Sequence, residues 1–272
     1  MRIKEFSRYE LKYLVTIDQC EEFIKILPNY LEPDPRGDQY GRYHITSLYY
    51  DSEDHSAYWN KIEGHKFRRK VRIRVYDAEV VTPESSCFAE IKQRINKTLQ
   101  KKRVVLPYAS AEILCGSGDI LVEEAEMSQA EREVVSEIRY LQSNLQLQPA
   151  CVVSYDRMAF DGSEYDDGLR ITFDTNLKGR VHDLTLLSTN YAENQFFFPP
   201  NVCIMEVKVN YRVPYWLTEM IGKYRFTLRR VSKYCAALER SKGLLQTQQL
   251  SYSAQAAPAA AAQPQSKEVL QT

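Results

Sequence analysis

The sequence lacks the features from which several common protein classes are built. No window approaches eighteen uncharged apolar residues, so no membrane-spanning helix is predicted. Charges run through the N-terminal segment MRIKEFSRYELKYLV, where a secretory signal would need an apolar run. Six cysteines are scattered without a CxxC pair, which favours buried free thiols. We therefore expect a cytoplasmic protein in a reducing compartment, with no transmembrane segment of its own.

Motifs of the usual catalytic and nucleotide-binding loops are absent as well. There is no GxxxxGK[ST], no GxGxxG after a predicted strand, no HExxH and no GxSxG. The four histidines are not clustered, which argues against a histidine metal site or catalytic triad. If the protein holds phosphates, side chains must do it, and arginine suits this because its planar fork meets two phosphate oxygens at once.

What the sequence has instead is charge placed on one face of several predicted strands. Charged and apolar side chains alternate with a period of two, so the charged ones leave the same face of a sheet. The whole chain is balanced, at 36 basic against 36 acidic residues. Counting Arg157 and Lys233 from two further segments, the set holds thirteen basic residues against four acidic ones: Arg8, Lys12, Lys70, Arg72, Arg74, Lys92, Arg94, Lys101, Arg103, Arg157, Arg170, Lys208 and Lys233 against Glu10, Glu90, Asp174 and Glu206. A concentrated positive face is what a polyanion needs.

The same pattern predicts a β-rich α+β protein. Nineteen tyrosines and ten phenylalanines suit a pleated surface, and 44% hydrophobic residues are enough for a core. We predict strands over 8–15, 45–50, 67–76, 87–95, 99–106, 151–160, 168–175 and 202–210, and helices over 18–27, 54–61, 128–147, 214–225 and 232–242. One domain is expected over residues 1–245. The low-complexity segment 246–272 is expected to be a disordered tail.

Two architectures fit these strands. In the first, an ordinary antiparallel sheet turns its charged face to water and covers helices with the other. The excess of one sign argues against it, since a merely soluble face would mix charges. In the second, eight strands close into a barrel with the charges inside and the helices outside. A lumen of like charge then needs acids, water or a polyanionic ligand to compensate it.

A resemblance favours the barrel. The segments that carry it come in a fixed order: Arg8-Tyr9-Glu10-Leu11-Lys12-Tyr13, Lys70-Val71-Arg72-Ile73-Arg74-Val75-Tyr76, Phe88-Ala89-Glu90-Ile91-Lys92, Ser154-Tyr155-Asp156-Arg157, Leu169-Arg170-Ile171-Thr172-Phe173-Asp174, Met205-Glu206-Val207-Lys208 and Ser232-Lys233-Tyr234. In this order they resemble the VTC domain, the polyphosphate polymerase branch of the triphosphate tunnel metalloenzymes, over roughly residues 6 to 240. The resemblance implies a closed antiparallel eight-stranded β-barrel, the triphosphate tunnel, with helices packed outside.

The resemblance also implies roles for individual residues. It puts catalytic contacts to the phosphates on Lys12, Arg72, Arg74, Lys92, Arg157, Arg170 and Lys233. It implies further phosphate binding by Arg8, Lys70, Arg94, Lys101, Arg103, Lys208 and Ser232. A Mn²⁺ or Mg²⁺ ion would be held by Glu206, with Glu10 and Glu90 as weaker candidates that could instead hold a neighbouring lysine or arginine in place.

One departure bears on the reaction. Hydrolytic members of the superfamily carry ExExK on the first strand, whereas this chain has Arg8-x-Glu10-x-Lys12. Exchanging a carboxylate for a cation weakens a metal-activated water and favours a longer anion, an arrangement shared with the VTC branch. The resemblance therefore implies transfer of the γ-phosphate of ATP to inorganic polyphosphate.

Alternatives remain at this stage. A metal-dependent tripolyphosphatase or nucleoside triphosphatase could use the same tunnel, and a non-catalytic polyphosphate or nucleotide sensor would only bind. Nucleic acid is not expected as a partner, because the pI is near neutral and no RNP-like aromatic pattern accompanies the basic residues. Any coupling to a membrane would need a separate partner protein.

Overall fold

The structure of the 272-residue chain is a computed structural model, and it describes residues 8–77, 80–96, 98–121, 124–163, 166, 168–188 and 195–241. The predicted tail over 246–272 lies outside the described residues. The strands are β1 (Arg8–Thr16), β2 (Leu31–Pro33), β3 (Arg42–Asp51), β4 (Phe67–Tyr76), β5 (Ser86–Ile95), β6 (Thr98–Pro107), β7 (Gln148–Gly162), β8 (Arg170–Arg180) and β9 (Val202–Asn210). The helices are α1 (Ile17–Ile24), α2 (Ser56–Ile62), α3 (Tyr108–Ser117), α4 (Gln129–Leu145), α5 (Tyr215–Lys223) and α6 (Lys233–Ser241), with short 3₁₀ turns over Leu27–Asn29 and Glu124–Glu126.

Most predicted elements are present, and the differences have local causes. The longest helix, predicted over 128–147, begins with a capping box, since the Ser128 hydroxyl accepts from the Glu131 N–H and the Glu131 carboxylate accepts from the Ser128 N–H. Helix α1 begins at Ile17, one residue before the predicted start at 18, because Thr16 caps it through a second capping box with Gln19. Helix α3 was not predicted, because it follows Pro107 without a side-chain cap. Strand β2 was not predicted either, being only three residues long.

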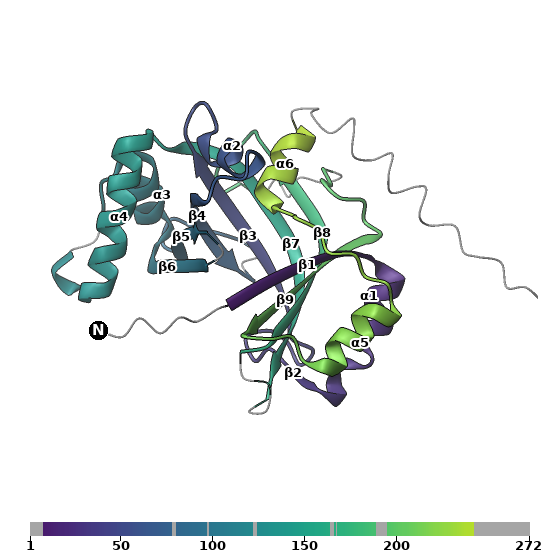
Figure 1. Cartoon of the computed structure of the whole chain (residues 1–272). Helices are drawn as coiled ribbons and strands as arrows, with labels where there is room; N and C mark the ends of the chain where they lie inside the picture. The colour runs from purple at the N-terminus through teal and green to yellow at the C-terminus, as the bar shows by residue number, and fades with distance from the viewer. Residues whose placement is uncertain are drawn as a thin grey trace, which may run out of the picture.

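A single antiparallel sheet organises the fold. Its strand order is β1-β9-β8-β7-β3-β4-β5-β6, with β2 added beside β7. The sheet curls so that β1 and β6, its two ends, face each other (Figure 1), and some of their Cα atoms approach within 8 Å. In the described part of the chain, no backbone ladder joins these two strands. The sheet is therefore open in its main-chain hydrogen bonding, and the closed barrel that we predicted is not confirmed.

Helices cover the outer face of this curled sheet (Figure 1). Helices α3 and α4 pack over β3 to β6, and α1 and α5 pack over β1, β8 and β9. Phe23 of α1 is fully buried there, and burying such a side chain contributes about 1.5 to 3 kcal/mol. Helix α6 departs from the predicted outside position, because its first residues, Lys233 and Tyr234, reach the inner side of the sheet.

Because side chains alternate along each strand with a period of two, one face of the sheet carries apolar residues and the other carries charged ones. In β4, Val71, Ile73 and Val75 are buried beneath the helices, while Arg72 and Arg74 point to the inner face. Since apolar groups take the outer face in strand after strand, the charged groups are collected on the concave side. This places the candidate site inside the curl.

Two further expectations are tested by the structure. All six cysteines are free and buried, as predicted. Among the described residues, no helix combines the length and apolar character needed to cross a bilayer.

Candidate functional site

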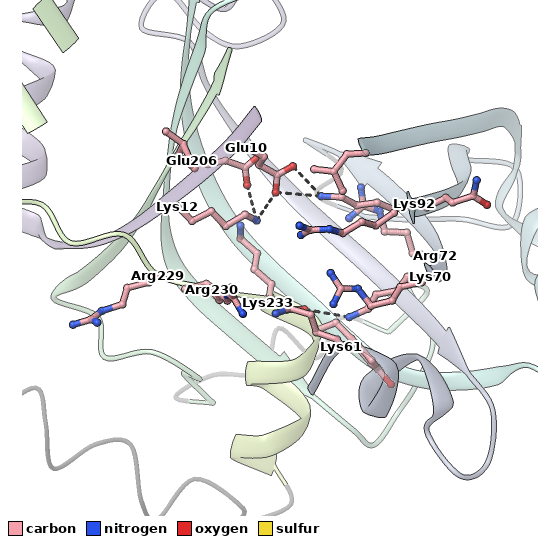
Figure 2. Close-up of a pocket in the computed structure, with 18 of the residues that line it drawn as sticks. Glu10, Lys12, Lys61, Lys70, Arg72, Lys92, Glu206, Arg229, Arg230 and Lys233 are labelled. Atoms are coloured by element: carbon pink, nitrogen blue, oxygen red, sulfur yellow. Dashed lines mark hydrogen bonds and ion pairs between the residues drawn. The ribbon is translucent and has the colours of Figure 1, made fainter. Parts of the chain in front are cut away.

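A cavity of about 740 Å³ occupies the concave side of the sheet. Its wall is strongly basic: fourteen lysines and arginines line it, with Glu10 and Glu206 as the carboxylates among the lining residues. The basic residues come from five strands (β1, β4, β5, β7 and β9), from α2 and the connection after it, and from the start of α6 and the segment before it: Lys12, Lys61, Lys66, Arg68, Lys70, Arg72, Arg74, Lys92, Arg94, Arg157, Lys208, Arg229, Arg230 and Lys233. Figure 2 shows lysines of opposite walls pointing toward one another across the space.

The first carboxylate group joins β1, β9 and β5. Lys12 Nζ lies 2.9 Å from Glu10 Oε1 and 2.8 Å from Glu206 Oε2, and Lys208 Nζ lies 2.6 Å from Glu206 Oε1. Lys92 reaches Glu10 Oε2 at 3.2 Å from the far side of the gap between β1 and β6. Lys92 lies in β5, next to the end strand β6, so this ion pair links β1 to the other end region of the curled sheet, where no backbone ladder joins the two ends in the described residues (Figure 2).

Charge decides the protonation of this group. Burial would raise the pKa of Glu10, but Lys12 and Lys92 outweigh it and lower the pKa to about 2. The pKa of Glu206 is lowered in the same way, against the effect of burial, chiefly by Lys12 and Lys208. Burial lowers the pKa of Lys92 to about 8, with Lys12 adding to the effect and Glu10 opposing it. Both carboxylates are therefore ionised at neutral pH.

A second group holds Arg72 in the middle of the wall. Glu90 Oε2 accepts from Arg72 Nε at 2.8 Å and from Nη2 at 2.6 Å, and the Tyr49 hydroxyl accepts from Nη1 at 3.0 Å. Glu90 is fully buried, and its other oxygen lies 3.3 Å from Lys101 Nζ. Burial would raise the pKa of Glu90, but Arg72, Arg74 and Lys101 lower it to about 2. Glu90 fixes the guanidinium from behind and does not itself line the cavity.

Asp174 organises a third group on β8. Its two oxygens accept from Arg157 Nε at 2.6 Å and Nη2 at 2.9 Å, and Lys233 forms an ion pair with the same carboxylate. Asp174 has no exposed surface. Burial would raise its pKa, but the Arg157 and Lys233 charges lower it to about 2. One buried carboxylate therefore holds two cavity cations in position.

The remaining lining cations have no carboxylate within 4 Å among the described residues. Arg74 is buried, yet its partners are neutral hydroxyls: Nε donates to Ser47 at 3.0 Å and Nη2 to Tyr155 at 3.2 Å. Lys70 donates to the Ser232 hydroxyl at 3.2 Å and lies over the Tyr234 ring. The others in this group are Lys61, Lys66, Arg68, Arg94, Arg229 and Arg230.

The structure brings most of the predicted residues together. Those that line the cavity are Lys12, Lys70, Arg72, Arg74, Lys92, Arg94, Arg157, Lys208, Ser232, Lys233, Glu10 and Glu206. Lys101 and Arg103 are exposed on the edge strand β6 and do not line it; Arg103 lies over the Phe88 ring, with its guanidinium carbon 4.5 Å from the ring centroid. Arg8 begins β1, and its side chain lies outside the described residues.

Arg170 is not brought to the cavity wall. It lies toward the start of β8, where Asp161 accepts at 2.6 Å and the buried Asp34 forms a second ion pair. The Tyr43 hydroxyl completes the shell at 2.9 Å. Asp34 comes from the segment after β2, a contact that no strand pattern indicates. Arg170 is therefore held by two carboxylates away from the residues that line the cavity, and its predicted role in phosphate binding stays a prediction.

Five lining cations were not predicted as site residues. Arg68 continues the alternation of β4 by one step, so the same pattern could have found it. Lys61 lies in helix α2, and Lys66 follows it in the connection to β4, where a period of two does not apply. Arg229 and Arg230 precede α6 in an irregular segment, and only their position beside Ser232 and Lys233 hints at a role.

Glu10 and Glu206 are the residues that fit a divalent metal. Mg²⁺ is commonly bound by one or two carboxylates together with substrate phosphates, and both of these side chains are ionised and converge on Lys12. No group of three or more histidine, cysteine, aspartate or glutamate side chains that could hold a metal was found in the described ranges. Any ion would therefore depend on phosphate oxygens to complete its coordination.

Comparisons with known proteins show similar folds and identify the family of this chain. HpAC1 from Hippeastrum, a candidate adenylyl cyclase reported to have a dominant triphosphatase activity, is similar in fold, with a TM-score of 0.51 at 14% identity over 87% of this chain and 95% of that one. A candidate adenylate cyclase from Bacillus halodurans gives a TM-score of 0.44 (13% identity, 83% and 95% covered), and the PH1819 protein from Pyrococcus horikoshii gives 0.42 (12%, 86% and 99%). A comparison with curated proteins finds no match. The family model of the VTC domain matches residues 7–242. The chain therefore belongs to the VTC domain family.

Proposed function

We propose that this protein is a polyphosphate polymerase that transfers the γ-phosphoryl group of ATP to the end of an inorganic polyphosphate chain. The observation that carries the proposal is the cavity itself, in which fourteen lysines and arginines face two lining carboxylates. Such an excess of fixed positive charge in a partly enclosed space is costly unless a polyanion neutralises it. Membership of the VTC domain family supports the same substrate class.

The reaction needs little covalent participation from the protein. The bond between the γ-phosphorus and the β–γ bridging oxygen of ATP breaks, and a terminal oxygen of the polyphosphate chain forms the new bond to that phosphorus. ADP leaves, and no proton changes hands, because the attacking phosphate oxygen is already ionised. Catalysis then consists of holding both anions in line and stabilising charge in the transition state.

The side chains suited to this work are those that hydrogen bonds already fix in place. Arg72 is held by Glu90, and Arg157 is held by Asp174, so both guanidinium groups are positioned before a substrate arrives. Arg74 is bound only by hydroxyls and can turn its remaining donors to phosphate oxygens. Pre-positioned donors of this kind lose little freedom when they bind.

Glu206 and Glu10 would hold the divalent cation of the proposed reaction, Mn²⁺ or Mg²⁺. Bound there, the ion would neutralise phosphate charge and help to orient the transferred group. Lys12 now lies between these two carboxylates, at 2.9 and 2.8 Å. A phosphate group would give the Lys12 ammonium another partner and release carboxylate oxygens, so substrate and metal binding are expected to support each other.

Incubating the purified chain with ATP and Mn²⁺ tests the proposal, with ADP, free phosphate and polymer measured together. ADP release with a growing ladder of polyphosphate on a gel supports it. ADP and free phosphate in equal amounts without polymer would instead identify a triphosphatase, the activity reported for HpAC1. Tight binding without turnover would identify a sensor, and either result overturns the polymerase.

A further inference from the structure

The basic residues of the cavity fall into two groups that differ in how their charge is balanced. Six are paired with a carboxylate: Lys12, Arg72, Lys92, Arg157, Lys208 and Lys233. The other eight have no ion pair within the described part of the chain. A site for a nucleotide triphosphate with its metal needs carboxylates as well as cations, and the first group supplies both. The second group supplies positive charge alone.

Four members of the second group come from α2, from β4 and β5 and from the segment leading into α6, and the charges of Arg68 and Arg230 act on Lys61 while those of Arg94 and Arg230 act on Arg68. We call these four the α2–α6 cluster: Lys61, Arg68, Arg94 and Arg230. Arg68 and Arg94 are direct partners in the β4–β5 register, a placement that is unfavourable for like charges. Arg94 Nε donates to the backbone carbonyl of Asn96, which leaves the rest of its guanidinium free of the contacts described.

The positive charges of the α2–α6 cluster repel one another, and no ion pair compensates them among the described residues. Burial lowers the pKa of Lys61, and Arg68, Lys70 and Arg230 lower it further. Burial likewise lowers the pKa of Arg68, together with the charges of Arg94 and Arg230. The Cys235 thiol opposes both shifts, but neither side chain has a carboxylate within 4 Å among the described residues. Cations held this close without acids are stabilised by an external anion.

The walls indicate what kind of anion this is. Single-stranded nucleic acids are usually bound by aromatic side chains on which their bases stack. The lining residues include three tyrosines and no phenylalanine or tryptophan. Tyr49, Tyr155 and Tyr234 are all buried, and Tyr49 and Tyr234 are stacked on each other with ring centroids 5.2 Å apart. They offer no free ring face to a base. An anion without bases, such as inorganic polyphosphate, fits these walls.

We propose that the α2–α6 cluster binds the polyphosphate chain beyond the phosphates that lie at the carboxylate groups, and that it does so without metal. This inference rests on the proposed function, of which it names the acceptor-chain site. It predicts that the cavity distinguishes polyphosphates by length: tripolyphosphate fills the paired region, and only a longer chain reaches the cluster.

The test compares two ligands in the presence of EDTA. Affinities for tripolyphosphate and for a long-chain polyphosphate are measured by calorimetry on the full chain and on the triple variant Lys61→Ala/Arg68→Ala/Arg230→Ala. Because a hydrogen bond to a charged group contributes about 1.5 to 3 kcal/mol, we expect long-chain affinity to fall at least about tenfold. Tripolyphosphate affinity should stay within about twofold, since its contacts are elsewhere.

Arg69→Ala is the matched control. Arg69 follows Arg68 in β4 but leaves the opposite face, where its guanidinium lies over the rings of Phe67 and Tyr140. The control matches the Arg68→Ala part of the triple variant: it removes one arginine from β4 without touching the cavity, so both affinities should be unchanged. If the triple variant folds poorly, Arg230→Ala alone serves, because Arg230 is exposed and its loss should not affect folding.

Three results would overturn the inference: an equal loss of affinity for both ligands, no loss for either, or tighter binding of an RNA homopolymer than of polyphosphate. The measurement involves no turnover, so it is independent of the polymerase assay. A length-selective loss in a protein that makes no polymer would reject the polymerase and keep the site. Polymer formation without length selectivity would do the reverse.

Discussion

Asp174 allows a specific test of how the positive charge of the cavity is compensated. This buried carboxylate lies between Arg157 and Lys233, and both cations depend on it as their ion-pair partner. Asp174→Asn keeps the shape and some hydrogen bonding but removes the negative charge. Two cations would then face the cavity without compensation.

Two separate arguments give the stability that Asp174→Asn should lose. The pKa of Asp174 is lowered from 3.8 to about 2, which corresponds to roughly 2 kcal/mol of folding stability. A lowered carboxylate pKa means that this stability is fully present above about pH 4 and is lost as pH falls through about 2. Removing one partner of a buried ion pair typically costs about 3 to 5 kcal/mol. We expect Asp174→Asn to cost about 3 kcal/mol, or about 6 to 12 °C in melting temperature.

Tripolyphosphate should reverse part of this loss. The ligand binds only the folded cavity, so it raises the melting temperature of the parent protein. In Asp174→Asn the freed Arg157 and Lys233 can bind phosphate oxygens, so the ligand-induced rise should be larger than in the parent. Thermal unfolding with and without tripolyphosphate measures both quantities in one experiment.

Asp156→Asn is the control for this experiment. Asp156 precedes Arg157 in β7 but leaves the other face, where it is about half exposed and bonded to His44 and Asn176. An exposed pair is worth about 0 to 1 kcal/mol, so this variant should melt close to the parent and respond normally to ligand. Our account of the cavity is refuted if the two variants are equally stable, or if ligand raises both by the same amount.

Three further predictions concern other parts of the wall. Arg74→Ala should reduce the tripolyphosphate-induced rise in melting temperature by more than half while Arg69→Ala leaves it intact; equal rises would place Arg74 outside the binding site. The pKa of Lys92 is lowered to about 8 by burial, with Lys12 adding to the effect, so the ammonium loses its proton as pH rises through 8 and tripolyphosphate affinity should fall there. Lys92→Arg should keep its tripolyphosphate affinity to higher pH, because a guanidinium stays protonated there. Calorimetry from pH 7 to about 9.5 measures this, and coinciding affinity profiles of the parent and the variant would contradict it. Glu206→Gln should abolish the Mn²⁺ dependence of tripolyphosphate binding but retain metal-free binding; an unchanged response to Mn²⁺ would remove Glu206 from the metal site.

The sequence predicts the inner face well because a period of two is a local property. Once β4 is extended, Arg72 and Arg74 must share a face whatever the rest of the chain does. The resemblance to the VTC family placed the eight main strands in the same fold, and that family is confirmed. The six paired cations, all predicted, lie on these strands or at the start of α6.

The period-two pattern along single strands could not predict which distant side chains form ion pairs. Whether Arg170 is free or bound depends on Asp34, a residue 136 positions away in an irregular segment. Lys61 and Arg230 reach the cavity from a helix and a loop, where strand periodicity says nothing about direction. Closure of the sheet was also not decided by the sequence, since it depends on accumulated twist and curl over all the strands.

The gap between β1 and β6 affects how easily these two end strands can separate. Among the described residues, no main-chain hydrogen bonds of a ladder must be broken to separate the two end strands, and an ion pair from β5 to β1, Lys92 to Glu10 at 3.2 Å, crosses the gap. Partly exposed ion pairs are weak, at about 0 to 1 kcal/mol, and phosphate competes for the same ammonium. Separating β1 from β6 to admit a wider ligand would therefore cost little more than this one weak ion pair.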